Sequence, residues 1–138
     1  IAGMGGNMIS NILNNCPWKN KHEKRFILNP MKYEEKLHEF LFSNGYEIQN
    51  EIAVKCCGKS YLIIDTRFTG KKYDPLPHEL YIGKLEKNLD ENAFALIRKQ
   101  IKNIENHRLG AHSECNSGKE QYFNEIHTYL TNILEKEK

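Results

Sequence analysis

The order in which hydrophobic periodicity changes along the chain constrains the fold more than any other feature of the sequence. Met8–Leu13 has apolar residues at helical spacing, Arg25–Leu28 resembles a short strand, and Lys32–Asn44 is again helical. Tyr46–Lys55 and Lys59–Phe68 then read as two strands that are joined by a tight turn. This alternation of helices and strands predicts half of an α/β sheet.

Individual residues refine this prediction. Asn7 is a suitable N-cap for the first helix, and Tyr33 and Leu37 begin the apolar stripe of the second. Gly45 should end that second helix, because glycine readily takes the left-handed conformation that follows many helices. Tyr61–Ile64 is apolar on both faces, so we expect it in the interior of the sheet.

The second half of the chain has a different pattern. Thr69–His78 is rich in turn residues and holds two of the four prolines. Beyond it, Glu91–Arg108 and Glu120–Glu135 are amphipathic, and Gly110–Gly118 is expected to connect them. We therefore expect an α/β domain over residues 1–75 and an antiparallel, coiled-coil-like helical hairpin over residues 76–138.

Composition narrows the class of protein. In 138 residues no apolar run approaches the ~20 residues of a membrane span, and the start of the chain lacks the pattern of a signal peptide. The formal net charge of +2 permits a nucleic-acid partner without requiring one. The four cysteines lack zinc-site spacing, so we expect free thiols in a cytoplasmic protein: Cys16, Cys56, Cys57 and Cys115.

Two short segments are candidates for binding. Gly3–Gly6 precedes a helix, where glycines allow a ligand to approach the backbone closely, although a purely structural turn is the alternative. Asn29–Pro30 ends a strand and should lie at the same sheet edge, where α/β proteins bind ligands. Asp65 is either a site carboxylate or a strand-end cap. We expect all six histidines to be solvated, and no GxSxG or HExxH motif is present.

Basic residues collect in two places. One set surrounds the first loop, and the other lies on the first of the two long helices; the sets are Lys19, Lys21, Lys24 and Arg25, and Arg98, Lys99, Lys102 and Arg108. Such residues either contact the phosphates of RNA or form an ordinary solvated face.

Several of these segments together resemble one family. The runs IAGMGG, RFILNP and EEKLHEFLFSNGYEI are similar to segments of the bacterial tRNA (adenine(22)-N1)-methyltransferases, with Asn29–Pro30–Met31 in place of a Gln-Pro-Asn-like segment. The resemblance implies the C-terminal half of a Rossmann-like class I methyltransferase sheet followed by a helical hairpin. It also implies S-adenosyl-L-methionine as cofactor and methyl transfer to N1 of an adenine in tRNA.

The resemblance further assigns roles to residues. It places Gly3, Met4, Gly5 and Gly6 beside the cofactor and Asn29 and Pro30 in the catalytic wall. The charge of the helix, and not the resemblance, makes Arg98, Lys99 and Lys102 candidates for contacting RNA. Nothing in the chain matches the family's acidic first loop or its ribose-binding carboxylate, and we expect those to precede Ile1. We accordingly expect a fragment that is inactive by itself, binds the cofactor weakly or not at all, and has an exposed sheet edge at which a second copy could pair.

Two alternatives remain open at this stage. The chain could be a non-catalytic RNA-binding or interaction module that uses its helical hairpin. A dinucleotide-binding oxidoreductase is not favoured, because the GxGxxG motif is missing.

Overall fold

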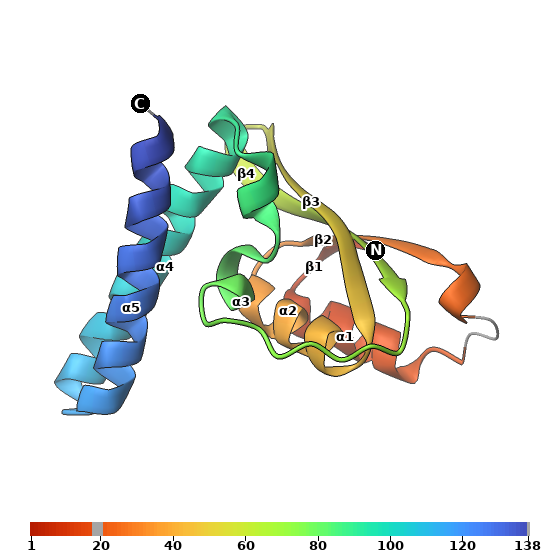
Figure 1. Cartoon of the computed structure of the whole chain (residues 1–138), viewed down its shortest axis with the longest axis horizontal. Helices are drawn as coiled ribbons and strands as arrows, with labels where there is room; N and C mark the ends of the chain where they lie inside the picture. Colours follow the sequence, from red (N-terminus) through yellow and green to blue (C-terminus); the bar gives the residue numbers. More distant parts are fainter. Residues whose placement is uncertain (18–20, 138) are drawn as a thin grey trace.

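The computed structural model describes residues 1–17 and 21–137. Four strands form one sheet, and five α-helices accompany it (Figure 1). The strands are β1 (Ala2–Met4), β2 (Arg25–Pro30), β3 (Tyr46–Cys56) and β4 (Lys59–Phe68). The helices are α1 (Gly6–Asn15), α2 (Glu34–Ser43), α3 (Glu79–Ile82), α4 (Glu91–Ser113) and α5 (Ser117–Leu134), with short 3₁₀ turns at Lys21–Glu23, Leu85–Asn88 and Glu135–Glu137.

The sheet has the strand order β1-β2-β4-β3. β1 is parallel to β2, whereas β4 runs antiparallel to both of its neighbours. The prediction that Tyr61–Ile64 lies inside the sheet is confirmed, since β4 pairs with β2 on one side and with β3 on the other. β1 and β3 form the two edges. The α/β fold class predicted from the sequence is therefore confirmed.

Helices α1 and α2 cover one face of this sheet (Figure 1). Strand alternation turns Leu28 and Ile64 toward the helices, where they are fully buried together with Ile9 and Leu37. Two local predictions were wrong. The first residue before α1 is Gly5 in an extended conformation, so Asn7 is not the N-cap. Tyr33 lies before α2 instead of within its apolar stripe.

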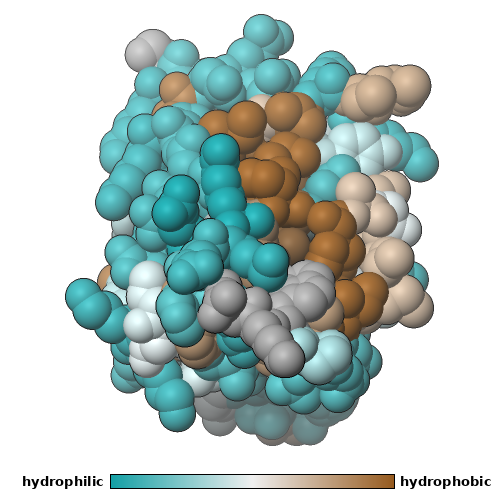
Figure 2. All heavy atoms as spheres, turned by 90° about the vertical axis from the view of Figure 1, so that its right-hand side faces the viewer, coloured by the Kyte–Doolittle hydropathy of each residue, from teal (hydrophilic) through white to brown (hydrophobic). Residues whose placement is uncertain are grey.

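The other face of the sheet is partly apolar and open. Ile27 and Ile52 have exposed fractions of 45% and 40%. Ile52 stands opposite Ile63 in the ladder, and directly opposed residues share a face. Figure 2 shows a continuous hydrophobic band on the side of the molecule that lies at the right in Figure 1. The chain therefore has a sheet that is covered by helices on one side only.

The helical hairpin is formed as predicted by α4 and α5, which lie along each other (Figure 1). Asp90 and Asn116 cap the two helices, with Oδ1 atoms that accept from Ala93 N at 2.8 Å and Lys119 N at 3.1 Å. α4 continues through Gly110 to Ser113, so the connection between the two helices is shorter than the predicted Gly110–Gly118. One buried cluster extends from Leu28 to Leu130, and the domain boundary at residue 75 stays a prediction.

A buried ion pair joins α2, β3 and the segment after α3. His38 is fully buried; its Nε2 lies 2.6 Å from Glu51 Oε1 and its Nδ1 lies 2.8 Å from the carbonyl oxygen of Leu80. Glu51 Oε2 accepts a hydrogen bond from the backbone N–H of Lys84. Burial opposes charge on this ring, but the Glu51 carboxylate outweighs it and raises the pKa of His38. The prediction that every histidine is solvated is therefore wrong for His38.

Candidate active site

The glycine-rich turn and the Asn29–Pro30 segment lie side by side. Ala2 pairs with Asn29 and Met4 pairs with Pro30, at the carboxyl ends of the two parallel strands. The N–H of Asn29 donates to the carbonyl of Ile1, and the N–H of Met31 donates to the carbonyl of Met4, both at 2.8 Å. The prediction that these two segments share one sheet edge is confirmed. Such an edge is where open α/β sheets bind ligands.

The positions of this turn require glycine to different degrees. Gly3 has a φ of +77°, and a Cβ there would meet nothing within 4 Å, so its backbone is strained for other residues but open to a ligand. Gly6 is buried, its N–H donates to the carbonyl of Lys32 at 2.7 Å, and a Cβ would collide with the carbonyl oxygen of Tyr33. Gly5 has ordinary geometry, with room for a Cβ at 3.5 Å from Lys32 Cγ. Close packing of α1 on the start of α2 thus explains Gly6, whereas Gly3 and Gly5 border open space or flexible side chains.

Asn29 and Pro30 differ in how they meet solvent. Pro30 is buried at the carboxyl end of β2, where it pairs with Met4. Asn29 is partly buried, and its Oδ1 atom is buried with no hydrogen-bond partner among residues 1–17 and 21–137. An unsatisfied buried acceptor costs roughly 1–3 kcal/mol, so it marks a place where a donor from a ligand would be favourable.

Tyr33 is a residue of this edge that the sequence analysis placed in the wrong role. It has a left-handed backbone, with φ 58° and ψ 42°, and its side chain is 47% exposed. Its ring lies beside Gly5, and Lys32 Nζ lies 5.2 Å from the ring centroid. Bulky residues rarely adopt this conformation, which costs about 1–3 kcal/mol and is enriched at functional sites. A tyrosine at a helix start, where Ser, Thr, Asp or Asn is usual, is the signal that could have revealed it.

The other polar candidates have partners within the chain. Asp65 lies inside β4 and receives two hydrogen bonds from Arg25, at 2.9 and 2.8 Å, so it is neither a strand-end cap nor free for a ligand. This bond to Arg25 lowers the pKa of Asp65. Among the first set of basic residues, Lys19 falls outside the part of the chain that the structure describes.

Of the basic residues of α4, Arg98, Lys99 and Lys102 are exposed, whereas Arg108 is half-buried. Arg98 forms an ion pair with Glu137, with N–O distances of 2.6 and 3.3 Å. Arg108 donates to Asn124 Oδ1 at 3.1 Å. Lys99 and Lys102 form no ion pair within the described residues. Two of the four cations that were expected to form one basic face therefore already have a hydrogen-bonding partner.

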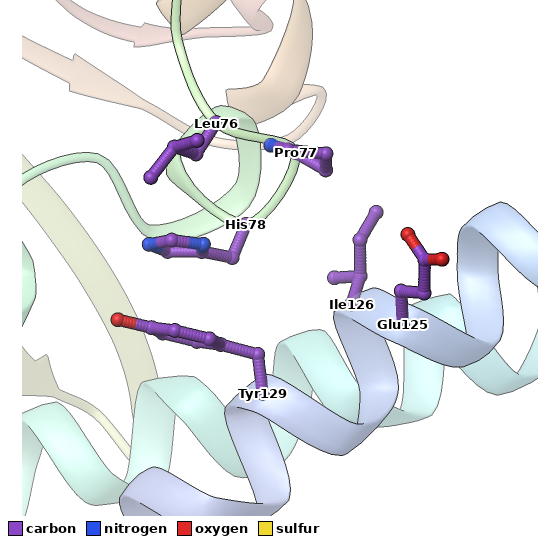
Figure 3. A pocket seen from close by; sticks show the side chains of 6 residues that line it. All are labelled: Leu76, Pro77, His78, Glu125, Ile126 and Tyr129. Carbon is purple, nitrogen blue, oxygen red and sulfur yellow. The ribbon is translucent and has the colours of Figure 1, made fainter.

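Another hollow lies between the segment before α3 and helix α5. It has a volume of about 260 Å³, and the rings of His78 and Tyr129 stack across it with centroids 3.6 Å apart (Figure 3). Tyr129 donates from its hydroxyl to Glu86 Oε1 at 2.7 Å, which raises the pKa of Tyr129 to about 12. Burial lowers the pKa of His78. The two rings stack on each other, and this contact attaches residues 76–78 to α5.

None of the helices in the described ranges has both the length and the apolar character that a membrane crossing needs. All four cysteines are free thiols.

Comparison with known proteins agrees with this geometry. Residues 1–64 match a family described as a methyltransferase domain. None of the curated proteins matches the chain. The chain is similar to the structure of the B. subtilis M1A22 tRNA methyltransferase TrmK, with 20% identity and a TM-score of 0.76, over 97% of this chain and 61% of that one.

Two structures of one Streptococcus pneumoniae protein, a candidate tRNA (m1A22) methyltransferase, are also similar. The first has 25% identity and a TM-score of 0.75, over 97% of this chain and 60% of the other. The second is a complex with S-adenosyl-L-methionine; it has 25% identity and a TM-score of 0.68, over 92% and 58%.

The chain thus spans about 60% of the length of the structures that it matches. Its resemblance to the bacterial tRNA (adenine(22)-N1)-methyltransferases is confirmed: residues 1–64 match a methyltransferase domain, and 97% of the chain shares the fold of those structures over about 60% of their length, which is consistent with a C-terminal part.

Proposed function

We propose that this chain forms the substrate-facing part of an S-adenosyl-L-methionine-dependent methyltransferase that methylates N1 of an adenine in tRNA. One observation carries the proposal: Gly3–Gly5 and Asn29–Tyr33 come together at the carboxyl ends of two adjacent parallel strands. The named activities of the similar structures support this choice of reaction and cofactor.

The residues of the edge fit the proposed cofactor. Gly3 has open space where a side chain would begin, and the partly buried Met4 follows it at the end of β1. Gly3, Met4 and Gly5 would hold the cofactor through close backbone approach, and Gly6 would fix the turn by packing on α2. When bound, S-adenosyl-L-methionine supplies an electrophilic methyl group on a sulfonium.

The chain's own contribution is to position the base. N1 of adenine already carries a lone pair, so the protein has to expose and orient it more than to activate it. An adenine in folded tRNA must leave its stack first, and the exposed ring of Tyr33 offers an aromatic surface for it. A rotamer change that turns Asn29 Oδ1 onto an N–H of the base would satisfy this acceptor. Pro30 keeps the strand end in place beneath Asn29.

The α4 face is a second part of the proposal. Lys99 and Lys102 would contact tRNA phosphates, with a smaller share for Arg98 because Glu137 already neutralises it. Charge reversal at all three positions should weaken tRNA binding and flatten its salt dependence. Unchanged affinity would assign the hairpin a purely structural role.

We also propose that a second copy of the chain pairs with the exposed edge strand β1. β1 is a three-residue edge strand that pairs only with β2 within the described chain. Light scattering over a range of concentrations would detect such a dimer, and a constant monomer mass would reject it.

An assay of methyl transfer with the full-length natural protein tests the proposed function. We expect Asn29→Ala to lower kcat/KM on unmodified tRNA by about 100-fold, the typical effect of losing precise orientation. Asn11→Ala is the matched control, because Asn11 is an exposed asparagine on α1. Equal activity of the two variants would remove Asn29 from the site. Binding of tRNA by the wild-type protein without any transfer would instead favour a non-catalytic RNA-binding module.

A further inference from the structure

A second surface with the chemistry of an RNA contact lies beside edge strand β3. Residues 71–73, in the segment after β4, face the end of α2 and the segment around α3 across a groove of about 390 Å³. Its lining includes four lysines, Lys71, Lys72, Lys84 and Lys87, and one glutamate, Glu47. The whole chain has 20 basic and 18 acidic residues, so cations are concentrated here.

The lysines of the groove are available to a ligand to different degrees. Lys84 Nζ forms an ion pair with Glu79 Oε2 at 2.8 Å, so its charge is already compensated within the chain. Lys71, Lys72 and Lys87 are exposed and form no ion pair within the described part of the chain. Glu79 is neutralised by Lys84, and Tyr73 also donates to it, so this carboxylate does not oppose an incoming phosphate.

The groove also contains a fixed aromatic ring. Tyr73 is 44% exposed, yet its hydroxyl donates to Glu79 Oε1 at 2.7 Å and its backbone N–H donates to the Phe42 carbonyl at 2.9 Å. The ring also contacts Phe42, with centroids 5.1 Å apart, and Lys84 Nζ lies 4.5 Å from its centroid. A ring that is held in place and still half open can stack with a base at little entropic cost.

The walls of the groove are anchored at both ends. The buried His38–Glu51 pair holds the backbone of Lys84, and the His78–Tyr129 stack attaches the segment that carries Tyr73 to α5 (Figure 3). A positively charged groove and an aromatic ring on which a base can stack are the two components of surfaces that bind single-stranded RNA without reading its sequence.

We propose that this Lys71–Lys72–Tyr73–Lys87 groove binds a backbone segment of the tRNA substrate, with an unpaired base stacked on Tyr73. The inference rests on the proposed function for the identity of the RNA. The groove lies at the start of β3 and the candidate active site at the carboxyl end of β1. Three strand spacings of about 4.8 Å separate these edge strands, and the two places lie toward opposite ends of the strands. One folded RNA can therefore contact both places.

The test compares two double variants of the whole natural protein. Lys71→Ala with Lys72→Ala removes two charges from the groove, whereas Lys55→Ala with Lys59→Ala removes two exposed charges beside the β3–β4 turn. We expect the groove variant to bind unmodified tRNA at least about 10-fold more weakly, with a salt slope reduced by about 2. Its KM for tRNA should rise while kcat stays unchanged, and the control should resemble the wild type.

Tyr73 supplies an independent measurement. Tyr73→Phe keeps the ring and loses the bond to Glu79, while Tyr73→Ala loses both, so a further loss of about 10-fold in affinity in the alanine variant reports stacking. Equal affinities of the groove and control double variants would overturn the proposal while leaving the methyltransferase function intact. A wild-type protein that does not methylate tRNA would instead refute the proposed function.

Discussion

Replacing Gly83 with alanine should disrupt the buried pair that joins the sheet to the segment after α3. Gly83 has a φ of +53°, and a Cβ there would collide with Glu51 Oε2 and His38 Nε2 and lie 2.5 Å from Glu51 Cδ. Glu51 would have to leave His38 and the N–H of Lys84. Breaking a buried ion pair costs about 3–5 kcal/mol, and alanine at this positive φ with a ψ of −123° adds roughly 1–3 kcal/mol of backbone strain. This sum is a large part of the ~5–15 kcal/mol that stabilises a typical domain.

Gly58→Ala is the matched control for this prediction. Gly58 has a φ of +77° in the β3–β4 turn, and a Cβ there would meet nothing within 4 Å. The control should lose only the conformational contribution, so the two variants should differ by at least about 3 kcal/mol in the free energy of unfolding. With a slope near 2 kcal/mol per molar urea, the midpoint of Gly83→Ala should be about 1.5 M below that of Gly58→Ala. Coincident midpoints would refute the reasoning.

Three further predictions concern the buried pair and the glycine-rich turn before α1. As pH rises above about 6.5 through the raised pKa of His38, the wild type should lose unfolding free energy, because the folded ring holds a proton that the unfolded ring has released. The nearby Glu34 and Glu51 carboxylates favour this charged form, and in urea titrations across this range His38→Gln should lack the slope; an unchanged slope would contradict the assignment. Gly6→Ala should destabilise the fold by more than about 2 kcal/mol in urea titrations, because a Cβ meets the backbone of Tyr33, and a neutral effect would disprove that close contact. Gly5→Ala should leave stability within about 1 kcal/mol of the wild type but weaken cofactor binding in calorimetry, and unchanged binding would exclude Gly5 from the cofactor site.

The sheet and the helical hairpin were predictable because their periodicities are strong. The apolar run at Tyr61–Ile64 indicated a central strand, and the joint position of Gly3–Gly6 and Asn29–Pro30 followed from the chain direction of parallel strands. These features depend on local pattern and on general rules of sheet topology, and the structure agrees with them.

The features that sequence reasoning missed depend on contacts between distant residues. His38 was assigned to the polar face of its helix, and the contacts with Glu51 and Leu80 show that it is buried. Position 6 requires glycine because the carbonyl of Tyr33, 27 positions further along the chain, leaves no room for a Cβ. The groove lysines come from two segments that the fold brings together, so no run of basic residues in the sequence marks all of them.

The most direct test of the central claim is the identity of the methylated product. The whole natural protein would be incubated with labelled S-adenosyl-L-methionine and unmodified tRNA, and the RNA would be digested to nucleosides and analysed by mass spectrometry. We predict that the label appears in N1-methyladenosine and that Asn29→Ala greatly reduces it. Label in a different nucleoside, or no transfer by the wild-type protein, would contradict the assignment of the β1–β2 edge to adenine-N1 methylation.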